Sequence, residues 1–183
     1  MIRRVTLPLS KEDAQSLRAG DTVLLTGAVY TGRDAAHRRL AALLAEGKPL
    51  PFDIRGETVY YVGPAPARPG SAVGPAGPTT SYRMDAYTPP LLRLGLRAMI
   101  GKGRRSQAVI DAMKETGAVY FGATGGAAAL IAKTVKKAEV VCYADLGPEA
   151  VHRFDVEDFP AVVLIDCLGN DLYAIGPAEY RET

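Results

Sequence analysis

The 183-residue sequence has no tryptophan and only two cysteines, and 7% of its residues are aromatic. So few aromatic side chains provide little of the stacking surface that single-stranded nucleic acid needs. Cys142 and Cys167 stand apart in separate apolar stretches. They lack the close spacing of zinc or iron–sulfur ligands, so we interpret them as buried free thiols and expect no metal site in this chain.

The sequence also lacks a large excess of one charge and any long apolar run. Its 22 Lys and Arg residues are balanced by 20 Asp and Glu residues, which leaves a formal net charge of +2. Such a balance provides no strong field for a nucleic acid backbone. No run approaches the roughly 20 apolar residues of a membrane span, and charged residues at 11–13 interrupt any signal-peptide core. We expect a cytoplasmic protein that binds neither nucleic acid nor membrane.

Helical and strand patterns alternate along most of the chain. Strand-like segments cover residues 22–26, 57–62, 98–100, 118–122 and 139–143. Helical patterns cover residues 10–19, 31–45, 84–96, 106–116 and 125–136, with prolines forcing a fresh start inside 84–96. This alternation is typical of an α/β fold, and the length suits one core. We predict a single α/β domain over residues 1–183.

The remaining segments are less regular. Residues 27–32 are predicted to form a loop, with Thr31 and Asp34 as a capping-box-like helix start. Residues 63–77 are rich in Pro, Gly and Ala without periodicity, which favours a lid or an approach to a site over disorder. The last third is predicted to form strands at 150–156, 161–165 and 171–175, with a hairpin turn at 168–171.

Three basic side chains occur at turns between the predicted elements: Arg33, Arg83 and Lys102. Arginine presents a planar fork to a carboxylate, and lysine presents a compact charge. Any one of them alone is most often a solvated surface cation. Because all three lie in glycine-flanked turns, where the backbone can approach an anion closely, they predict a site for a dicarboxylate.

Thr79 and Thr80 lie just before Arg83 in a Pro/Gly-rich turn. One interpretation is that a threonine caps the following helix. The other is catalytic: a threonine hydroxyl is a poor base unless nearby cations favour its deprotonated form, and Arg83 could supply that field. Both interpretations remain open at the level of the sequence.

Other polar residues have structural alternatives too. Asp34 and His37 are spaced i, i+3 on one helix face, as a structural pair or as support for the binding residues. His152 lies in a strand-like segment and is interpreted as structural. The segment Gly122–Ala127 either holds a phosphate at a helix start or packs a strand closely against a helix, and it matches no nucleotide fingerprint.

Taken together, these motifs resemble the β subunit, or C-terminal domain, of the iron–sulfur class I fumarate hydratase and L(+)-tartrate dehydratase family. The resemblance runs nearly end to end. It rests on Gly20-Asp21, Arg33–His37, Gly77–Asp85, Gly101–Gly103 and Thr124–Ala129. It implies a swivelling β/β/α domain that closes over a partner subunit.

The resemblance also implies a chemistry, the addition or removal of water at a dicarboxylate with a [4Fe-4S] cluster as Lewis acid. In this family the α subunit binds the cluster, so the chain would form a hetero-oligomer with that subunit, or a homo-oligomer when isolated. Matching the motifs residue by residue assigns Arg33, Arg83 and Lys102 to the substrate carboxylates and Thr79 to the base at C3. Asp34, His37 and Thr80 would support them.

Within the family, the segments 82–89 and 124–130 are similar to the fumarase branch. Arg104 is a departure, because two-subunit fumarases often carry Asn there, and it places an extra cation near the site. We therefore expect the β subunit of a fumarate hydratase that interconverts fumarate and (S)-malate and is inactive alone. The alternatives are the β subunit of L(+)-tartrate dehydratase, a non-catalytic dicarboxylate-binding module and a phosphate-binding transferase.

Overall fold

The structure, a computed structural model, describes residues 2–179, which form a mixed α/β domain. One seven-stranded sheet has the strand order β1-β2-β3-β4-β5-β7-β6. Strand β2 also pairs with β7, so that β2, β3, β4, β5 and β7 close into a five-stranded ring. The predicted α/β class is confirmed, whereas the closed ring was not predicted.

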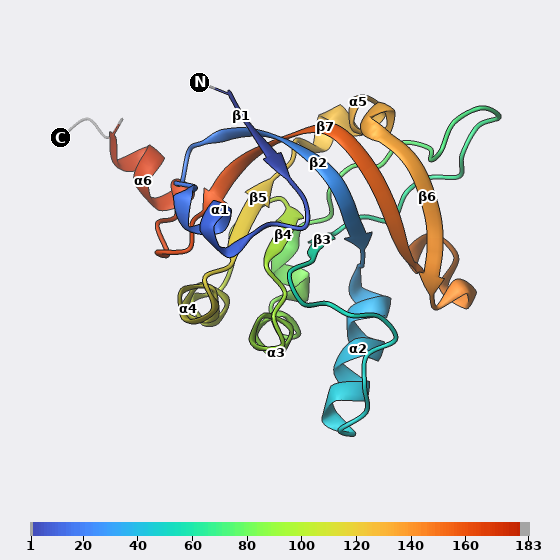
Figure 1. Cartoon of the computed structure of the whole chain (residues 1–183), viewed down its shortest axis with the longest axis horizontal. Coiled ribbons are helices and arrows are strands. Elements are labelled where there is room, and N and C mark those ends of the chain that lie inside the picture. Colours follow the sequence, from blue (N-terminus) through green and yellow to red (C-terminus); the bar gives the residue numbers. More distant parts are fainter. Residues whose placement is uncertain (1, 180–183) are drawn as a thin grey trace.

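The strands are β1 (Ile2–Thr6), β2 (Thr22–Thr31), β3 (Thr58–Tyr60), β4 (Ala98–Gly101), β5 (Val119–Gly122), β6 (Val135–Cys142) and β7 (Val151–Ile165). The α-helices are α1 (Lys11–Ser16), α2 (Asp34–Ala45), α3 (Thr88–Arg93), α4 (Gln107–Thr116), α5 (Ala128–Thr134) and α6 (Leu172–Glu179). The 3₁₀ helices are η1 (Ser81–Met84), η2 (Gly125–Ala127) and η3 (Ala144–Glu149). Figure 1 shows α2, α3 and α4 below the strands and α5 above them.

Strands β1 to β5 pair in parallel in chain order, and β7 runs antiparallel to β2, β5 and β6. The four parallel ring strands β2, β3, β4 and β5 therefore end at the same edge. Since active sites in open parallel sheets gather beyond the carboxyl ends of the strands, this edge is where the fold favours a site.

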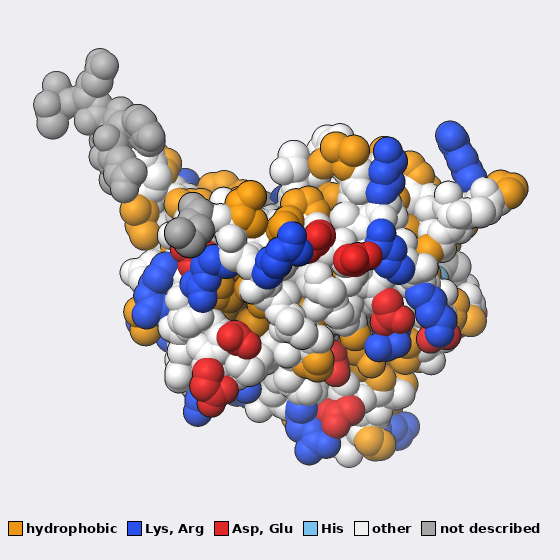
Figure 2. All heavy atoms as spheres, turned by 45° about the horizontal axis from the view of Figure 1, so that its top comes forward, with side chains coloured by type: hydrophobic (Ala, Val, Ile, Leu, Met, Phe, Trp, Pro, Cys, Tyr) orange, Lys and Arg blue, Asp and Glu red, His pale blue; other side chains and the backbone are white. Residues whose placement is uncertain are grey.

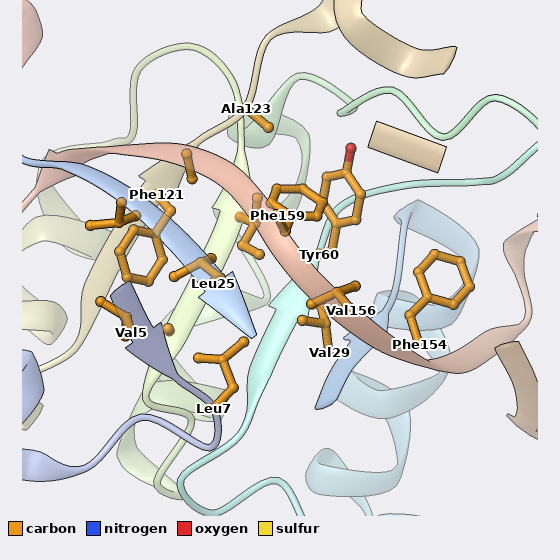
Figure 3. Close-up of a cluster of buried hydrophobic side chains, with 14 of the residues drawn as sticks. Val5, Leu7, Leu25, Val29, Tyr60, Phe121, Ala123, Phe154, Val156 and Phe159 are labelled. Carbon is orange, nitrogen blue, oxygen red and sulfur yellow. The ribbon is translucent and has the colours of Figure 1, made fainter. Parts of the chain in front are cut away.

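Successive side chains of the ring strands enter two different cores, because they point to opposite faces. Tyr60 and Phe121 belong to the core inside the ring, whereas Val59 and Tyr120 belong to a second core with side chains of α3 and α4. Figure 3 shows the ring core, which includes Val5, Leu7, Leu25, Val29, Phe154, Val156 and Phe159. The central ring strands β3, β4 and β5 are thus packed on both faces, whereas β2 and β7 have exposed residues on one face.

The predicted loop at 27–32 is wrong, because β2 continues to Thr31. Gly27 has a φ of +134°, and it lies at a register shift between β2 and β7. A β-carbon there would lie 2.3 Å from the Leu7 carbonyl oxygen. Glycine therefore marks a bulge inside a long strand rather than the end of the strand.

The C-terminal prediction is also partly wrong. The two predicted strands 150–156 and 161–165 are one continuous strand, β7, and the predicted strand 171–175 begins the helix α6. The predicted hairpin-type turn at 168–171 is confirmed, because Ile165 and Asp171 form an isolated antiparallel bridge across it. The Asp171 carboxylate then accepts a hydrogen bond from the Tyr173 N–H at 2.9 Å, which favours a helix rather than a strand after the turn. Asp166, fully buried, forms the preceding turn by accepting from the N–H groups of Leu168 and Asn170.

Helix starts were predicted with mixed success. Ser10 caps α1, and its hydroxyl accepts from the Asp13 N–H at 2.9 Å, as predicted. The fresh start at the paired prolines is confirmed, since they occupy the first positions of α3. Thr31 is not a cap: it ends β2, and its hydroxyl donates to the Ala150 carbonyl at 3.3 Å. The predicted helix 125–136 is shorter, because β6 already begins at Val135.

No helix within residues 2–179 is long and apolar enough to cross a membrane. On the face displayed in Figure 2, Lys and Arg side chains lie among Asp and Glu side chains. This mixing agrees with the net charge of +2.

Candidate active site

The predicted site residues gather beyond the carboxyl ends of neighbouring parallel strands. Arg33 follows β2, and Lys102 directly follows β4. Thr79 lies beside the end of β3, because its N–H donates to the Tyr61 carbonyl at 2.6 Å. The tertiary structure thus brings three separate turns to one edge of the sheet.

The turn with Thr79 and Thr80 is joined to the turn with Lys102. Thr80 and Lys102 form an isolated parallel β-bridge. The Ser81 N–H donates to the Lys102 carbonyl at 2.9 Å, and the Lys102 N–H donates to the Ser81 hydroxyl at 3.1 Å. A β-carbon on Gly101 would lie 1.9 Å from Ser81 Oγ, so this approach requires glycine. The two motifs form one unit.

The glycine-rich segment before α5 borders the same unit. A β-carbon on Gly125 would lie 3.4 Å from Lys102 Nζ, and one on Gly77 would lie 3.1 Å from the Ala128 β-carbon. A β-carbon on Gly122 would lie only 2.5 Å from Leu164 Cδ1. Close packing therefore accounts for Gly122 and Gly77, whereas the contact at Gly125 is ordinary and Gly126 has no neighbour within 4 Å of its β-carbon position. The packing interpretation is favoured at Gly122, where the strand ends.

The helix-cap interpretation fails for Thr80. This residue does occupy the position before η1, but its side chain makes no cap hydrogen bond. Thr79 stands one residue earlier, with a half-buried side chain beside Pro78, which is buried. Neither hydroxyl is committed to capping η1.

Asp34, the first residue of α2, lies between two arginines. Its carboxylate accepts from Arg83 Nε at 2.9 Å, and Arg83 Nη2 lies 2.9 Å from its second oxygen. Arg33 is held more loosely, with Nε 3.9 Å from Asp34 and Nη2 3.5 Å from Glu149. Arg33 Nε is buried and has no hydrogen-bond partner among the described residues. Asp34 Oδ2, 3.9 Å away, is likewise buried and, apart from its ion pair with Arg83, has no hydrogen-bond partner among the described residues.

His37 supports Arg33 through the backbone rather than pairing with Asp34. Its Nδ1 lies 2.9 Å from the Arg33 carbonyl, and its ring packs edge-on against Tyr61 at 5.4 Å. Burial lowers the pKa of His37 from 6.5 to about 4, so the imidazole is neutral near pH 7. A carbonyl only accepts, so the proton of the neutral ring is on Nδ1.

Arg105 was not predicted as a site residue, and its surroundings differ from those of Arg104. The Arg105 side chain is fully buried, with Nε donating to Asp85 at 2.7 Å and Nη2 donating to Thr88 at 2.9 Å. Arg104 donates to the Tyr173 carbonyl of α6 at 3.3 Å, and the Tyr173 hydroxyl accepts from the Gly103 N–H at 3.2 Å. The role of Arg104 as an extra cation near the site stays a prediction. Both arginines lie in the same basic turn, and no local pattern separates them.

The described residues do not fit an iron–sulfur cluster. Within residues 2–179, no group of three or more His, Cys, Asp or Glu side chains could hold a metal ion. Cys142 is half-buried at the end of β6, where burial raises its pKa to about 11, and Cys167 is buried after β7. His152 Nδ1 lies 2.9 Å from the Ala150 carbonyl, a structural contact.

The arrangement of the motifs agrees with a comparison to known protein families. A family model described as fumarase C-terminus matches residues 2–176. The chain belongs to the fumarase C-terminus family. It is 45% identical over 151 residues to fumarate hydratase class I, anaerobic, of Escherichia coli (strain K12), a match that covers 81% of this chain and 28% of that protein. It is 40% identical over 157 residues to fumarate hydratase 2 of Leishmania major, covering 85% and 28%.

A third member of the comparison has a length like that of this chain. A protein of Methanocaldococcus jannaschii with the provisional assignment L(+)-tartrate dehydratase subunit beta is 37% identical over 171 residues, covering 90% of this chain and 88% of that protein. By contrast, the chain spans only 28% of the length of the two fumarate hydratases. The fumarase C-terminus fold therefore matches one part of long proteins and nearly the whole of a short one.

Proposed function

We propose that this chain is the β subunit of a two-subunit class I fumarate hydratase, which interconverts fumarate and (S)-malate together with an α subunit. The observation that carries the proposal is the bridge between Thr80 and Lys102, which joins two family motifs next to Thr79. The identity to fumarate hydratases over most of this chain supports the reaction. The match to a protein assigned as a β subunit supports a separate partner.

In this proposal, three cations bind the two substrate carboxylates. Arg33 contributes a buried Nε without a partner among the described residues. Lys102 contributes an exposed ammonium beside Gly125. Arg83 is oriented by Asp34, and its remaining N–H groups would bind a substrate carboxylate. Preorganised cations of this kind need little reorientation when the dianion binds.

Thr79 is proposed as the base at C3 of malate. In the dehydration direction, its deprotonated oxygen would take the C3 proton, and the electrons of that C–H bond would form the C2–C3 double bond. The C2 hydroxyl would leave with the C–O electron pair as hydroxide, which takes up a proton and departs as water. Negative charge builds up on the carboxylate next to C3 during proton removal. Lys102 and Arg83 would stabilise that charge more strongly in the transition state than in the ground state.

We assign the [4Fe-4S] cluster to the α subunit, because the described cysteines do not fit one. The site face is open: the side chains of Arg83 and Arg33 are 43% and 27% exposed. An open half-site is what a swivelling β/β/α domain would present to a partner that completes it. The chain would then work as part of a hetero-oligomer and have no hydratase activity alone.

The test is anaerobic co-expression with a candidate cysteine-bearing α subunit, followed by the ultraviolet loss of fumarate. Turnover of fumarate that collapses in Thr79→Ala would support the proposal. Hydratase activity of the isolated, metal-free chain would contradict the need for a partner. Turnover of neither fumarate nor tartrate would leave a dicarboxylate-binding module.

The β subunit of L(+)-tartrate dehydratase is the second candidate. It is favoured by the nearly full-length match to the Methanocaldococcus jannaschii protein. L(+)-tartrate and meso-tartrate therefore belong in the same assay. Turnover of L(+)-tartrate alone would assign the chain to this sister reaction.

A further inference from the structure

A buried guanidinium lies directly behind the two joined site turns. The Arg105 side chain has 0% exposure. Its Cζ lies 5.2 Å from the ring centre of Tyr61 and 5.1 Å from that of Tyr120. Its Nη1 donates to the Tyr61 hydroxyl at 3.2 Å, and its Nε donates to Asp85 at 2.7 Å. The guanidinium is therefore satisfied along its edge and packed on aromatic rings.

Each neighbour of Arg105 leads back to the site. The Tyr120 hydroxyl lies 2.8 Å from Ser81 Oγ and 2.9 Å from the Gly103 carbonyl oxygen, and the same Ser81 oxygen accepts from the Lys102 N–H at 3.1 Å. Tyr61 accepts from the Thr79 N–H through its carbonyl at 2.6 Å. Thr79 is thus tied to Tyr61 through its own N–H, and Lys102 is tied to Tyr120 through Ser81 Oγ. Both tyrosines contact Arg105.

Asp85 closes the network from the other side. One carboxylate oxygen accepts from Arg105 Nε, and the other accepts from the Ser106 N–H at 2.6 Å. Asp85 follows η1 and Ser106 precedes α4, so a single ion pair links the ends of the two site turns. A buried ion pair is weak evidence for stability, but it can select one arrangement of the groups around it.

We propose that Arg105 is a positioning residue, which sets the distance between Thr79 and Lys102 through Tyr61, Tyr120 and Asp85. The catalytic consequence of this inference rests on the proposed function. Its structural consequence rests on the hydrogen bonds alone. Lysine cannot replace Arg105, because it has neither the planar fork for Asp85 and Thr88 nor a flat face for the two tyrosine rings. Arg105→Lys keeps the positive charge but loses the planar group that makes these contacts.

The structural consequence is tested by hydrogen exchange on the full chain, without any substrate. In Arg105→Lys the amides of Ser81 and Lys102 are expected to exchange about tenfold faster or more, since loss of the network opens the joined turns locally. The matched control is Arg93→Lys, which changes an exposed arginine of α3 that pairs with Glu115 of α4 at 3.2 Å. Unchanged protection of Ser81 and Lys102 in Arg105→Lys would overturn the proposal.

The catalytic consequence is tested in the complex with the α subunit, using malate deuterated at C3. Misplacement of Thr79 slows proton removal, so Arg105→Lys is expected to lower kcat by about 10²-fold and to raise the deuterium isotope effect on kcat. A variant that only unfolds in part would lower the active fraction and leave the isotope effect unchanged. Two results together would overturn the catalytic role. The isotope effect would be unchanged in Arg105→Lys, and the kcat of this variant, corrected for the fraction of folded protein, would equal that of Arg93→Lys.

The two readouts separate the two proposals. Faster exchange at Ser81 and Lys102, together with a wild-type complex that turns over neither malate nor fumarate, would support the positioning role and contradict the fumarate hydratase assignment. Normal exchange in Arg105→Lys, together with active wild-type enzyme, would support the assignment and contradict the positioning role.

Discussion

Asp34 and Arg83, which lie 49 positions apart in the sequence, form a two-point ion pair at 2.9 Å for each nitrogen–oxygen contact. Asp34 begins α2 and Arg83 lies in η1, so the pair joins two of the elements that carry proposed substrate ligands. The side chain of Asp34 is 24% exposed, which limits screening by water. Asp34 thereby fixes the orientation of a cation that we assign to the substrate.

Loss of this pair should weaken substrate binding. In Asp34→Asn, Arg83 loses its bidentate partner and gains rotamer freedom, so we expect the KM for malate to rise about tenfold with a smaller change in kcat. Steady-state kinetics of the complex measure this. Asp53→Asn is the control, because Asp53 forms a similar fork with Arg55 at an exposed position. Equal KM values for wild type and Asp34→Asn would contradict the orienting role.

The two threonines should differ in their effect on turnover. Thr79→Ala removes the proposed base, and we expect kcat to fall by about 10²-fold or more, the usual range for a general base. Thr79→Ser keeps a hydroxyl and should recover part of the rate. Thr80→Ala should have a much smaller effect. Steady-state kinetics of the three variants in the complex test which threonine is the base. A larger loss of kcat in Thr80→Ala than in Thr79→Ala would reassign the base to Thr80.

Gly101 should tolerate no side chain. A β-carbon there would lie 1.9 Å from Ser81 Oγ and 2.9 Å from a ring carbon of Tyr61. Forcing in a methyl group should cost about 1–3 kcal/mol of unfolding free energy, as overpacking does elsewhere. Gly126→Ala is the control, since no atom lies within 4 Å of the β-carbon position there. Urea unfolding of both variants measures the difference, and equal stability would show that the Ser81 contact is loose.

His37 should make the fold sensitive to mild acid. Its pKa is about 4 in the folded chain and 6.5 in the unfolded one, because burial disfavours the charged ring. The unfolded state therefore binds more protons below pH 6.5, and stability falls as the pH drops from 6.5 towards 4. The full loss is on the order of 3 kcal/mol.

The measurement for His37 is urea unfolding at several pH values between 7 and 4 for wild type and His37→Asn. Asparagine can still donate to the Arg33 carbonyl but does not titrate. The difference in unfolding free energy between the two proteins should shift in favour of His37→Asn as the pH falls. Parallel curves over the whole range would mean that His37 is protonated in the folded chain at an ordinary pKa.

The cysteines should be dispensable for the cluster. Cys142 and Cys167 lie on different elements and have structural surroundings, so Cys142→Ser with Cys167→Ser should leave the iron and sulfide content of the complex unchanged. Chemical analysis and the visible spectrum of the anaerobic complex test this. Because burial raises the pKa of Cys142 to about 11, its alkylation by iodoacetamide at pH 8 should also be slow. Loss of iron in the double variant would place a cluster ligand in this chain.

Much of the secondary structure was accessible from local pattern. The polar cap at Ser10 appears where capping chemistry places it, and the body of α2 and the strands β3, β4 and β5 overlap the segments that periodicity indicates. The strand β1 and the exact start of α2 were not predicted. Prediction failed where a residue type has two meanings. Gly27 was interpreted as the start of a loop but forms a bulge, because β2 continues its pairing with the distant strand β7 beyond it. The segment after the turn at 168–171 was interpreted as a strand but forms α6.

For the site, the sequence by itself determined which turns carry cations and threonines, because Arg33, Thr79 and Lys102 lie in or beside glycine-containing turns between predicted elements. Only the tertiary structure decided how those turns meet. The antiparallel pairing of β2 with β7 closes the ring, Asp34 pairs with Arg83, and of two adjacent arginines one is buried while the other extends to α6. The physical reason is that hydrophobic periodicity indicates which face of a helix or strand is buried. An ion pair between two elements depends instead on which surfaces the closed sheet brings together.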